Sequence, residues 1–377
     1  MSRASTSVTP TSGIAVPRST CCGCWIHCIM FAGVFDSRPA RYVRTAILPS
    51  GGPTVPVRSG CPECRDTNRT RIDQWPSCPC QDHTGERDCL FTDGVAAVAA
   101  RHTNENFVER YRILLYRISS NVIPFASHPI NELKWWEEFT PELEALGRRL
   151  RAIGVRVSTH PGQFTVLNSP TPAIVAAAFA ELEYHARLLD ASGADTSAKI
   201  VVHIGGLYAG SETAALDRFC AVAAHLPDAV LRRMVVENDD RLFDAEEVLS
   251  VAHRLRVPVV FDWLHDTANP CRAPLSEVLP AIFATWKPKD GRPKLHLSSQ
   301  ATAAPRGAHA RYVRAVDAMG HLRGVSGRPF DCMLEAKEKD RALLKLRADL
   351  RRKGVIESDL AAPVSSLPLA ARRKQRP

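Results

Sequence analysis

Histidines and carboxylates recur at the ends of short apolar runs between residues 155 and 335. Each side chain of this kind can bind a metal ion or transfer a proton. In chain order they are His160, His203, Glu237, Asp262, His265, His296, His309 and Glu335. One histidine at a strand end is more often a hydrogen-bonded structural residue than a ligand. Eight such residues at equivalent positions of successive runs are better explained by one shared site.

The residue types indicate which ions such a site would take. Carboxylates that converge raise one another's pKa unless cations lie between them. Imidazole mixed with carboxylate suits zinc, manganese or iron better than calcium or magnesium cages. Eight ligands exceed the coordination number of one ion, so we expect two or three divalent metal ions. Clusters with ions about 3.5–4 Å apart activate water and stabilise the leaving oxygen in phosphoester hydrolysis.

Lys294 stands two residues before His296, so both side chains point to the same side of a strand. An ammonium group beside divalent cations is unfavourable, and the pKa of Lys294 should therefore fall. A neutral amine could react with carbon dioxide to form a carbamate, which is an anionic ligand. A lysine that contacts DNA phosphate explains the same position, and the residues alone leave both interpretations open.

The elements that position these residues alternate regularly from residue 112 onward. We expect strands at Ile113–Ile118, Val155–Thr159, Ile200–His203, Met234–Glu237, Val259–Asp262, Leu295–Ser298 and Cys332–Glu335. We expect helices at Pro141–Ile153, Pro172–Ala191, Glu212–Leu226, Ala245–Leu255, Leu275–Trp286, Ala308–Met319 and Arg341–Lys353. The first helix should begin with Thr140 as its N-cap and Pro141 at its first position.

Alternating strands and helices predict a parallel sheet with crossover helices. Seven visible units favour an α/β fold of the TIM type, a (β/α)8 barrel, whose first strand and helix are divergent or incomplete. An open doubly wound sheet is the alternative, but the sequence contains no GxGxxG or GxxxxGK[ST] loop. In a barrel, all the candidate ligands would lie at the carboxyl-terminal face.

Composition and charge exclude several classes of protein. The 377 residues are 45% hydrophobic and 24% charged, which excludes a disordered, collagen-like or disulfide-stapled chain. No apolar run approaches the roughly 20 residues that span a bilayer. The 49 basic residues exceed the 40 acidic ones and give a net charge of +9. This excess slightly favours a phosphate-bearing partner.

Three parts of the chain differ in composition. Residues 1–95 are rich in Cys, Ser and Pro, and we expect an irregular, poorly ordered segment. Within it, Cys61, Cys64, Cys78 and Cys80 resemble a zinc ribbon in outline, but the second pair is spaced too tightly. Residues 96–355 should form the barrel domain. Residues 356–377 form a basic tail.

Five segments resemble the UV damage endonuclease family, and the similarity covers roughly residues 105–350. They are Tyr116–His128, Ser158–Pro170, Val201–Gly206, Val236–Arg241 and Lys294–His296. The resemblance implies a TIM-barrel DNA repair enzyme with a three-metal centre, commonly of manganese, with zinc or magnesium as alternatives. Such enzymes nick the strand immediately 5′ to cyclobutane dimers and 6-4 photoproducts, and they need no ATP.

The resemblance also assigns roles to residues. The family's metal ligands match the eight residues named above, and its carboxylated lysine matches Lys294. Glu237, Lys294 and His160 are the expected catalytic residues. The family's Gln-Tyr pair, which wedges into the duplex at the lesion, falls on Gln163 and Phe164. Phenylalanine keeps the stacking face and lacks the hydroxyl group; without the resemblance, the same residues would indicate a tight turn with a packed aromatic ring.

The chain departs from the family pattern in two places. Family members begin with a strand that ends in a lesion-probing Tyr and Asn, followed by a full helix. Here Asn104–Phe107 runs into Arg112–Arg117 through a shorter connection, and the first strand cannot be placed. A missing first strand would expose the edges of its neighbours. Trp263 and Leu264 also stand where the family often has further histidines.

These observations predict a metal-dependent endonuclease that acts on UV-damaged double-stranded DNA. We expect a monomer without a membrane association, cytoplasmic and acting at the nucleoid, with an organelle or nuclear destination as the alternative. Within the enzyme class, an apurinic-site endonuclease and a sugar isomerase are the nearest alternatives. A damage-binding protein that has lost catalysis through its divergent front half is the alternative from another class.

Overall fold

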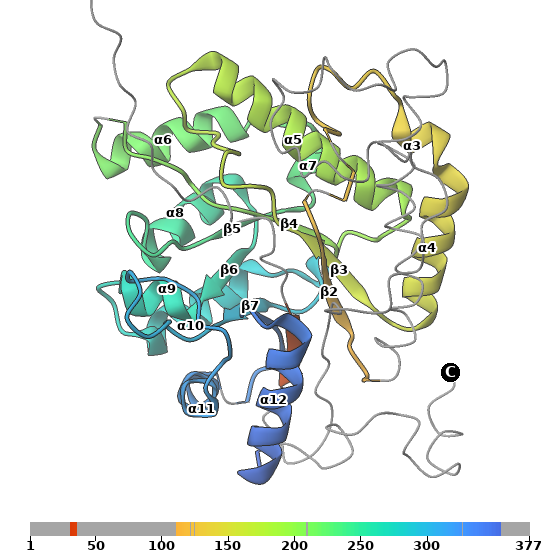
Figure 1. The fold of residues 1–377 in the computed structure, drawn as a ribbon. Coiled ribbons are helices and arrows are strands. Elements are labelled where there is room, and N and C mark those ends of the chain that lie inside the picture. The colour runs from red at the N-terminus through yellow and green to blue at the C-terminus, as the bar shows by residue number, and fades with distance from the viewer. Residues whose placement is uncertain are drawn as a thin grey trace, which may run out of the picture.

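The computed structural model describes a strand at residues 31–35 and residues 111–355, apart from Asn121, Pro124, Ala209 and Ser326. Eight strands close into a barrel that helices surround (Figure 1). The strands are β1 (Phe31–Phe35), β2 (Leu115–Ile118), β3 (Arg156–Thr159), β4 (Lys199–Val202), β5 (Met234–Glu237), β6 (Val259–Asp262), β7 (Lys294–Leu297) and β8 (Phe330–Leu334). The predicted TIM-type barrel is confirmed.

Helices follow most of the strands. They are α3 (Trp135–Glu138), α4 (Thr140–Ala152), α5 (Pro172–Ala191), α6 (Glu212–Ala223), α7 (Asp228–Leu231), α8 (Ala245–Leu255), α9 (Trp263–Ala268), α10 (Leu275–Thr285), the 3-10 helix η4 (Pro288–Asp290), α11 (Ala315–Gly324) and α12 (Lys339–Arg352). None of the helices in the described ranges is long and apolar enough to cross a membrane.

The first strand is the one that departs from a regular barrel. Strands β2 to β8 pair in parallel and in chain order. Strand β1 runs antiparallel to both of its neighbours, with Phe31 opposite Tyr116 of β2 and opposite Leu334 of β8. It comes from the segment that sequence predicted to be irregular, and it covers two edges that would otherwise lack partners. The cysteine pairs and the lesion-probing residues of the front lie outside the described residues.

An apolar layer fills part of the barrel interior directly below the candidate ligands. Val201, Val235 and Val260 form a cluster with Trp286 that is separate from the main hydrophobic core. Each valine stands two residues before a predicted ligand, so period-two alternation points both side chains inward. The Trp286 indole donates its Nε1 hydrogen to the Val259 carbonyl at 2.7 Å. Bulky side chains at this level make the barrel a packed core rather than a pore.

Paired charges occupy the opposite end of the barrel. Lys199 begins β4, and its Nζ donates to Asp290 Oδ1 at 2.6 Å. Arg156 begins β3, and its Nη1 donates to Asp331 Oδ2 at 2.7 Å. Lys199, Asp290 and Asp331 are buried, and burial of a charge is tolerated when an opposite charge accompanies it. The amino-terminal ends of the strands therefore carry a network that serves the structure.

Helix α8 illustrates how the outer layer forms. Asp244 accepts hydrogen bonds from the backbone amides of Glu246 and Glu247, and the Glu247 side chain accepts from the Asp244 amide. This capping box satisfies amides that the first turn leaves free. Val248 and Val251, three residues apart on one face, are fully buried. Their burial fixes the helix against the barrel wall.

Two predictions about helix starts are wrong. Thr140 is the first residue of α4 and not its N-cap; its hydroxyl donates instead to the carbonyls of Trp136 and Glu137 in α3. The helix predicted at Ala308–Met319 begins only at Ala315. Backbone groups of residues 308–310 bond to Ala301, Ser299 and Lys337, and so are not available for a helix.

Candidate metal centre

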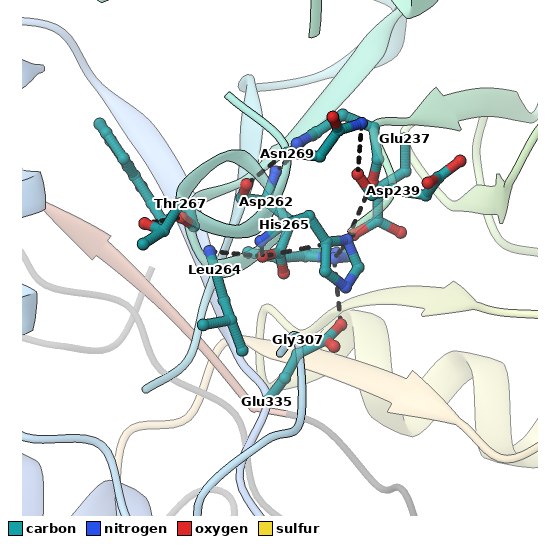
Figure 2. A network of polar contacts seen from close by, with 12 residues as sticks. Glu237, Asp239, Asp262, Leu264, His265, Thr267, Asn269, Gly307 and Glu335 are labelled. Atoms are coloured by element: carbon teal, nitrogen blue, oxygen red, sulfur yellow. Dashed lines mark hydrogen bonds and ion pairs between the residues drawn. The ribbon is translucent and has the colours of Figure 1, made fainter. Parts of the chain in front are cut away.

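All eight predicted ligands gather at the carboxyl-terminal face of the barrel. His160 and His203 follow β3 and β4, Glu237 and Asp262 end β5 and β6, and His296 lies in β7. His265 lies in α9, His309 in the loop after β7, and Glu335 directly after β8. Figure 2 shows Glu237, Asp262, His265 and Glu335 close together. The convergence follows from parallel strands that all end on one side.

Glu237 is the centre of the cluster. Its carboxylate is almost fully buried, and its Oε2 lies 3.3 Å from His160 Nε2 and 3.4 Å from His203 Nε2. Its Oε1 lies 2.5 Å from His296 Nδ1 and 4.0 Å from His265 Nδ1. One carboxylate thus faces four imidazole rings. Oε2 faces His160 and His203, whereas Oε1 faces His296 and His265.

Asp262 divides its two oxygens between the fold and the site. Oδ1 accepts from the amides of Leu264 and His265 at 2.7 and 2.8 Å, and thereby caps helix α9. Oδ2 is buried and has no hydrogen-bond partner. Asn238 holds the strand end in place, because its side chain bonds both the amide and the carbonyl of Asp262. A buried carboxylate oxygen without a donor is expected where a cation binds.

Six of the eight predicted ligands form two groups that can hold metal ions. His160, His203 and Glu237 form one, and Glu237, Asp262, His296 and Glu335 form the other, with ligand atoms within 4.8 Å of one another in each group. Glu237 belongs to both, as expected of a carboxylate that bridges two ions. Three buried carboxylates mixed with imidazoles fit divalent cations of the manganese or zinc kind.

The remaining two histidines lie at the border of these groups. His265 Nδ1 lies 4.0 Å from both Asp262 Oδ1 and Glu237 Oε1, and His309 Nδ1 lies 3.5 Å from Glu335 Oε2. The His265 ring donates from Nδ1 to the Asn238 carbonyl at 2.9 Å. A backbone carbonyl that holds Nδ1–H leaves Nε2 free as a ligand. His160 uses the same device with the Pro161 carbonyl at 3.0 Å.

Arg117 is a site residue that the sequence reasoning missed. It lies in β2, is 3% exposed, and places Nη2 2.8 Å from His296 Nε2 and Nη1 3.1 Å from Glu335 Oε1. Arginine can only donate, so His296 Nε2 accepts and Nδ1 carries the proton shared with Glu237. An arginine within the otherwise apolar run Leu115–Ile118 is the signal that could have revealed it.

Lys294 lies beside this cluster, on the same strand face as His296. Its side chain is 1% exposed, and its Nζ has no hydrogen-bond partner. Burial, followed by the positive charges of Arg117 and Arg156, holds the pKa of Lys294 well below its usual value. The direction of the pKa shift agrees with the sequence prediction, but its causes here are burial and two arginines rather than metal ions.

Burial and charge move the pKa values of the cluster in opposite directions. Burial lowers the pKa of His160 to about 4. Burial also opposes protonation of His265, but the carboxylates of Asp262, Glu237 and Glu335 outweigh it and raise its pKa to about 9. For Glu237, burial favours the neutral acid, yet the facing His296 and His203 hold its pKa well below the usual value.

A glycine permits the loop that carries His309 to approach the end of β5. Gly307 has a φ of +82°, and a Cβ atom there would lie 2.0 Å from Asp240 Oδ2. Its amide donates to Gln300 Oε1 at 2.9 Å. The position of Gly307 next to the site is visible in Figure 2. A side chain at residue 307 would collide with Asp240, so the loop could not approach the end of β5 in this way.

Gln163 and Phe164 lie outside this cluster, in the loop that follows β3. Both are exposed, and 82% of the Phe164 side chain is open to solvent. The interpretation as a tight turn with a packed aromatic ring is therefore wrong in its second half. The turn itself is present, since the Thr165 amide donates to the Gly162 carbonyl at 2.9 Å.

Comparisons with known proteins agree on one family. The sequence profile of the family "UV-endonuclease UvdE" matches residues 85–362. A protein from Bacillus cereus strain G9842 named "UV DNA damage endonuclease" is 38% identical over 242 residues, which are 64% of this chain and 76% of the relative. A protein of the same name from Bacillus thuringiensis subsp. konkukian is 37% identical over the same shares.

A solved structure described as SacUVDE has a similar fold. It is 31% identical to this chain and superimposes with a TM-score of 0.66. The match covers 74% of this chain and 93% of that one. The barrel of this chain therefore has the same overall architecture as that protein.

Binding of metal to this cluster should release protons at neutral pH. The carboxylates of Asp262, Glu237 and Glu335 raise the pKa of His265 to about 9, so this ring carries a proton at neutral pH that a bound cation would displace. We expect at least one proton released per protein at pH 7.5, and a metal affinity that rises as pH approaches 9. Calorimetry with Mn²⁺ in two buffers of different ionisation enthalpy measures this number.

The control is His265→Gln, which should reduce the release by about one proton. Equal binding heats in both buffers would contradict the predicted protonation.

Proposed function

Because the chain belongs to the UV-endonuclease UvdE family, we propose that it is a metal-dependent endonuclease that nicks duplex DNA 5′ to cyclobutane dimers and 6-4 photoproducts. One observation carries the proposal. The family match over residues 85–362 contains the whole cluster of buried histidines and carboxylates at the barrel mouth. Membership and a site suited to phosphoester hydrolysis thus coincide in the same residues.

The residues of the cluster would hold two or three divalent ions, with manganese as the preferred metal and zinc or magnesium as alternatives. Bound ions supply Lewis-acid chemistry, since they lower the pKa of water and neutralise charge on a phosphate. Glu237 would bridge the two groups, and the buried Oδ2 of Asp262 would take up a ligand position. Arg117 keeps Glu335 and His296 oriented toward the centre.

His160 can take part in proton transfer as well as in binding. Burial keeps the ring neutral at neutral pH, with a pKa of about 4, and the Pro161 carbonyl holds its Nδ1 hydrogen. Nε2 is therefore the atom that can bind a cation or accept a proton next to Glu237. The barrel interior below, packed with valines, keeps water away from the buried side of the cluster.

The substrate we propose is UV-damaged double-stranded DNA. Gln163 and Phe164 project from the loop after β3, four residues or fewer from His160. An exposed aromatic ring can stack where a displaced base leaves a gap. Such a wedge favours a damage enzyme over an apurinic-site endonuclease or a sugar isomerase. The catalytic unit we propose is residues 96–355, with residues 1–95 contributing strand β1.

The direct test is incision of an end-labelled duplex that contains one thymine dimer. With Mn²⁺ we expect a nick immediately 5′ to the dimer, no nick in the undamaged duplex, and no nick after EDTA. Glu237→Gln should lower incision by about 10³-fold or more, because the neutral amide removes the charge shared by both metal groups. Binding of the damaged duplex, measured by fluorescence anisotropy, should change little.

Three other outcomes distinguish the alternatives. Cleavage of an abasic duplex in preference to the dimer would favour an apurinic-site endonuclease. Isomerisation of a sugar without any nick would favour the isomerase. Stoichiometric metal and damage-specific binding without a nick would identify a protein that has lost catalysis.

Gln163→Ala should weaken the discrimination of damaged from intact duplex. The Gln163 side chain is exposed, so its removal should leave the stability of the fold unchanged. The ratio of the dissociation constant for intact duplex to that for damaged duplex should fall about five-fold or more. Competition binding with dimer-containing and intact duplexes measures the ratio. Lys134→Ala, an exposed residue before α3, is the control. Unchanged discrimination would argue against a wedge at this position.

We also propose that Lys294 is carboxylated when metal is bound. The supporting observation is a buried Nζ without a partner, on a lysine whose pKa burial lowers. A neutral amine can add carbon dioxide, and the carbamate would contribute a negative ligand. Protein equilibrated with ¹³C-bicarbonate should show one carbamate signal in ¹³C NMR that Lys294→Met abolishes. A spectrum identical for both proteins would exclude the modification.

A further inference from the structure

Two loops at the mouth of the barrel are locked to each other. One follows β3 and carries Gln163 and Phe164; the other follows β4 and begins at His203. The buried Asn168 of the first loop donates from Nδ2 to the Gly206 carbonyl of the second at 2.9 Å. The contact is close enough that a Cβ on Gly205 would lie 2.3 Å from Asn168 Oδ1.

The Arg218 side chain of helix α6 forms hydrogen bonds with both loops. Its Nε donates to the Asn168 carbonyl at 2.6 Å, and its Nη2 lies 3.4 Å from the Leu207 carbonyl. The guanidinium group is thus held in place by backbone acceptors of both segments. It also lies 5.8 Å from the centre of the Tyr208 ring. The two loops and Arg218 therefore form one unit.

Tyr208 is the residue of this unit that packing does not explain. Its side chain is 42% exposed, and Phe164 is the other exposed aromatic side chain among the described residues. Its backbone has a φ of +53°, a left-handed conformation that is unfavourable for a bulky residue. The ring rests over Gly206, where a Cβ would lie 3.1 Å from its Cε2. Strain of this kind persists when the surrounding structure holds a residue in a useful position.

We propose that Tyr208 is a second stacking residue for a nucleobase of the bound DNA, in addition to Phe164. Tyr208 lies five residues after His203 on β4, and Phe164 four residues after His160 on the adjacent β3. His160 and His203 are thus each followed by an exposed aromatic ring, and the two rings lie on loops at the same face of the barrel. Because the loops are bonded to each other, the two rings are presented as a pair.

The chemistry around Tyr208 indicates a base rather than an apolar partner. Arg218 lies near the ring, and the exposed polar residues Ser211 and Glu212 follow shortly after it in the chain. An aromatic face with a neighbouring cation is the combination that binds unpaired bases and the adjacent phosphate. When a lesion is displaced from the helix, a base loses its stacking partner, and Tyr208 would replace that partner.

This inference depends on the proposed function, and the experiment separates the two. The probe is a thymine-dimer duplex with 2-aminopurine opposite the dimer, whose fluorescence is quenched by stacking. Tyr208→Ala should raise KM for the dimer duplex between roughly five- and a hundred-fold with kcat changed much less. The 2-aminopurine signal of the complex should be higher than with the unaltered protein. Tyr208→Phe should keep both values within about two-fold, because it retains the ring.

Two further variants control for folding and position. Tyr208→Gly relieves the left-handed backbone, so it should fold at least as well as the unaltered protein and still show the higher KM. Val355→Ala changes a side chain of similar exposure at the end of α12, at the opposite end of the barrel, and should behave like the unaltered protein. Metal content should be equal in all variants.

The outcomes assign any failure to its source. If the unaltered, metal-loaded protein does not nick the dimer duplex, the proposed function is wrong and the role of Tyr208 fails with it. If that protein nicks the duplex and Tyr208→Ala and Tyr208→Gly match it in KM and in fluorescence, only the stacking role is overturned. A rise in KM that Tyr208→Phe does not rescue would also overturn it, since the hydroxyl rather than the ring would then be used.

Discussion

The repulsion among three buried carboxylates is the constraint on which this structure depends. Glu237, Asp262 and Glu335 lie within one cluster, shielded from water by the barrel wall. Negative charges in such a setting persist only with positive charge between them, and the imidazoles, Arg117 and bound cations are the groups that can provide it. The pKa of His265 is raised and the pKa of Glu237 is lowered for the same reason, because each group faces groups of opposite charge in the cluster.

Buried charged groups are paired within the protein at one end of the barrel, and some are left without partners at the other. At the amino-terminal end, Lys199 and Arg156 each meet a carboxylate at hydrogen-bond distance, and the charges are balanced within the protein. At the carboxyl-terminal end, Asp262 Oδ2 has no such partner, and neither has the Nζ of Lys294, which begins β7 two residues before His296. The first arrangement stabilises the barrel, whereas the second leaves binding capacity for ions and substrate. A layer of valines separates the two.

We propose that the loops, rather than the cluster, select the substrate. The candidate ligands lie at or near the strand ends, while the loops after β3 and β4 carry the exposed rings of Phe164 and Tyr208. Asn168 and Arg218 tie these loops to each other without touching a ligand side chain. In this proposal, the residues for catalysis and those for recognition follow one another along the chain after the same two strands, β3 and β4.

The sequence by itself determined the seven parallel strands, most of the helices between them and the eight candidate ligands. It could do so because short apolar runs that end in a polar residue are local patterns, and parallel strands all end on one face. Only the tertiary structure decided the rest. Strand β1 closes the barrel against residues some 300 positions away in β8, and nothing in its own five residues states that partner. Arg117 became a site residue through contacts with His296 and Glu335, and Tyr208 through its exposure and its neighbour Arg218. Long-range contacts decide such roles, and no local pattern encodes them.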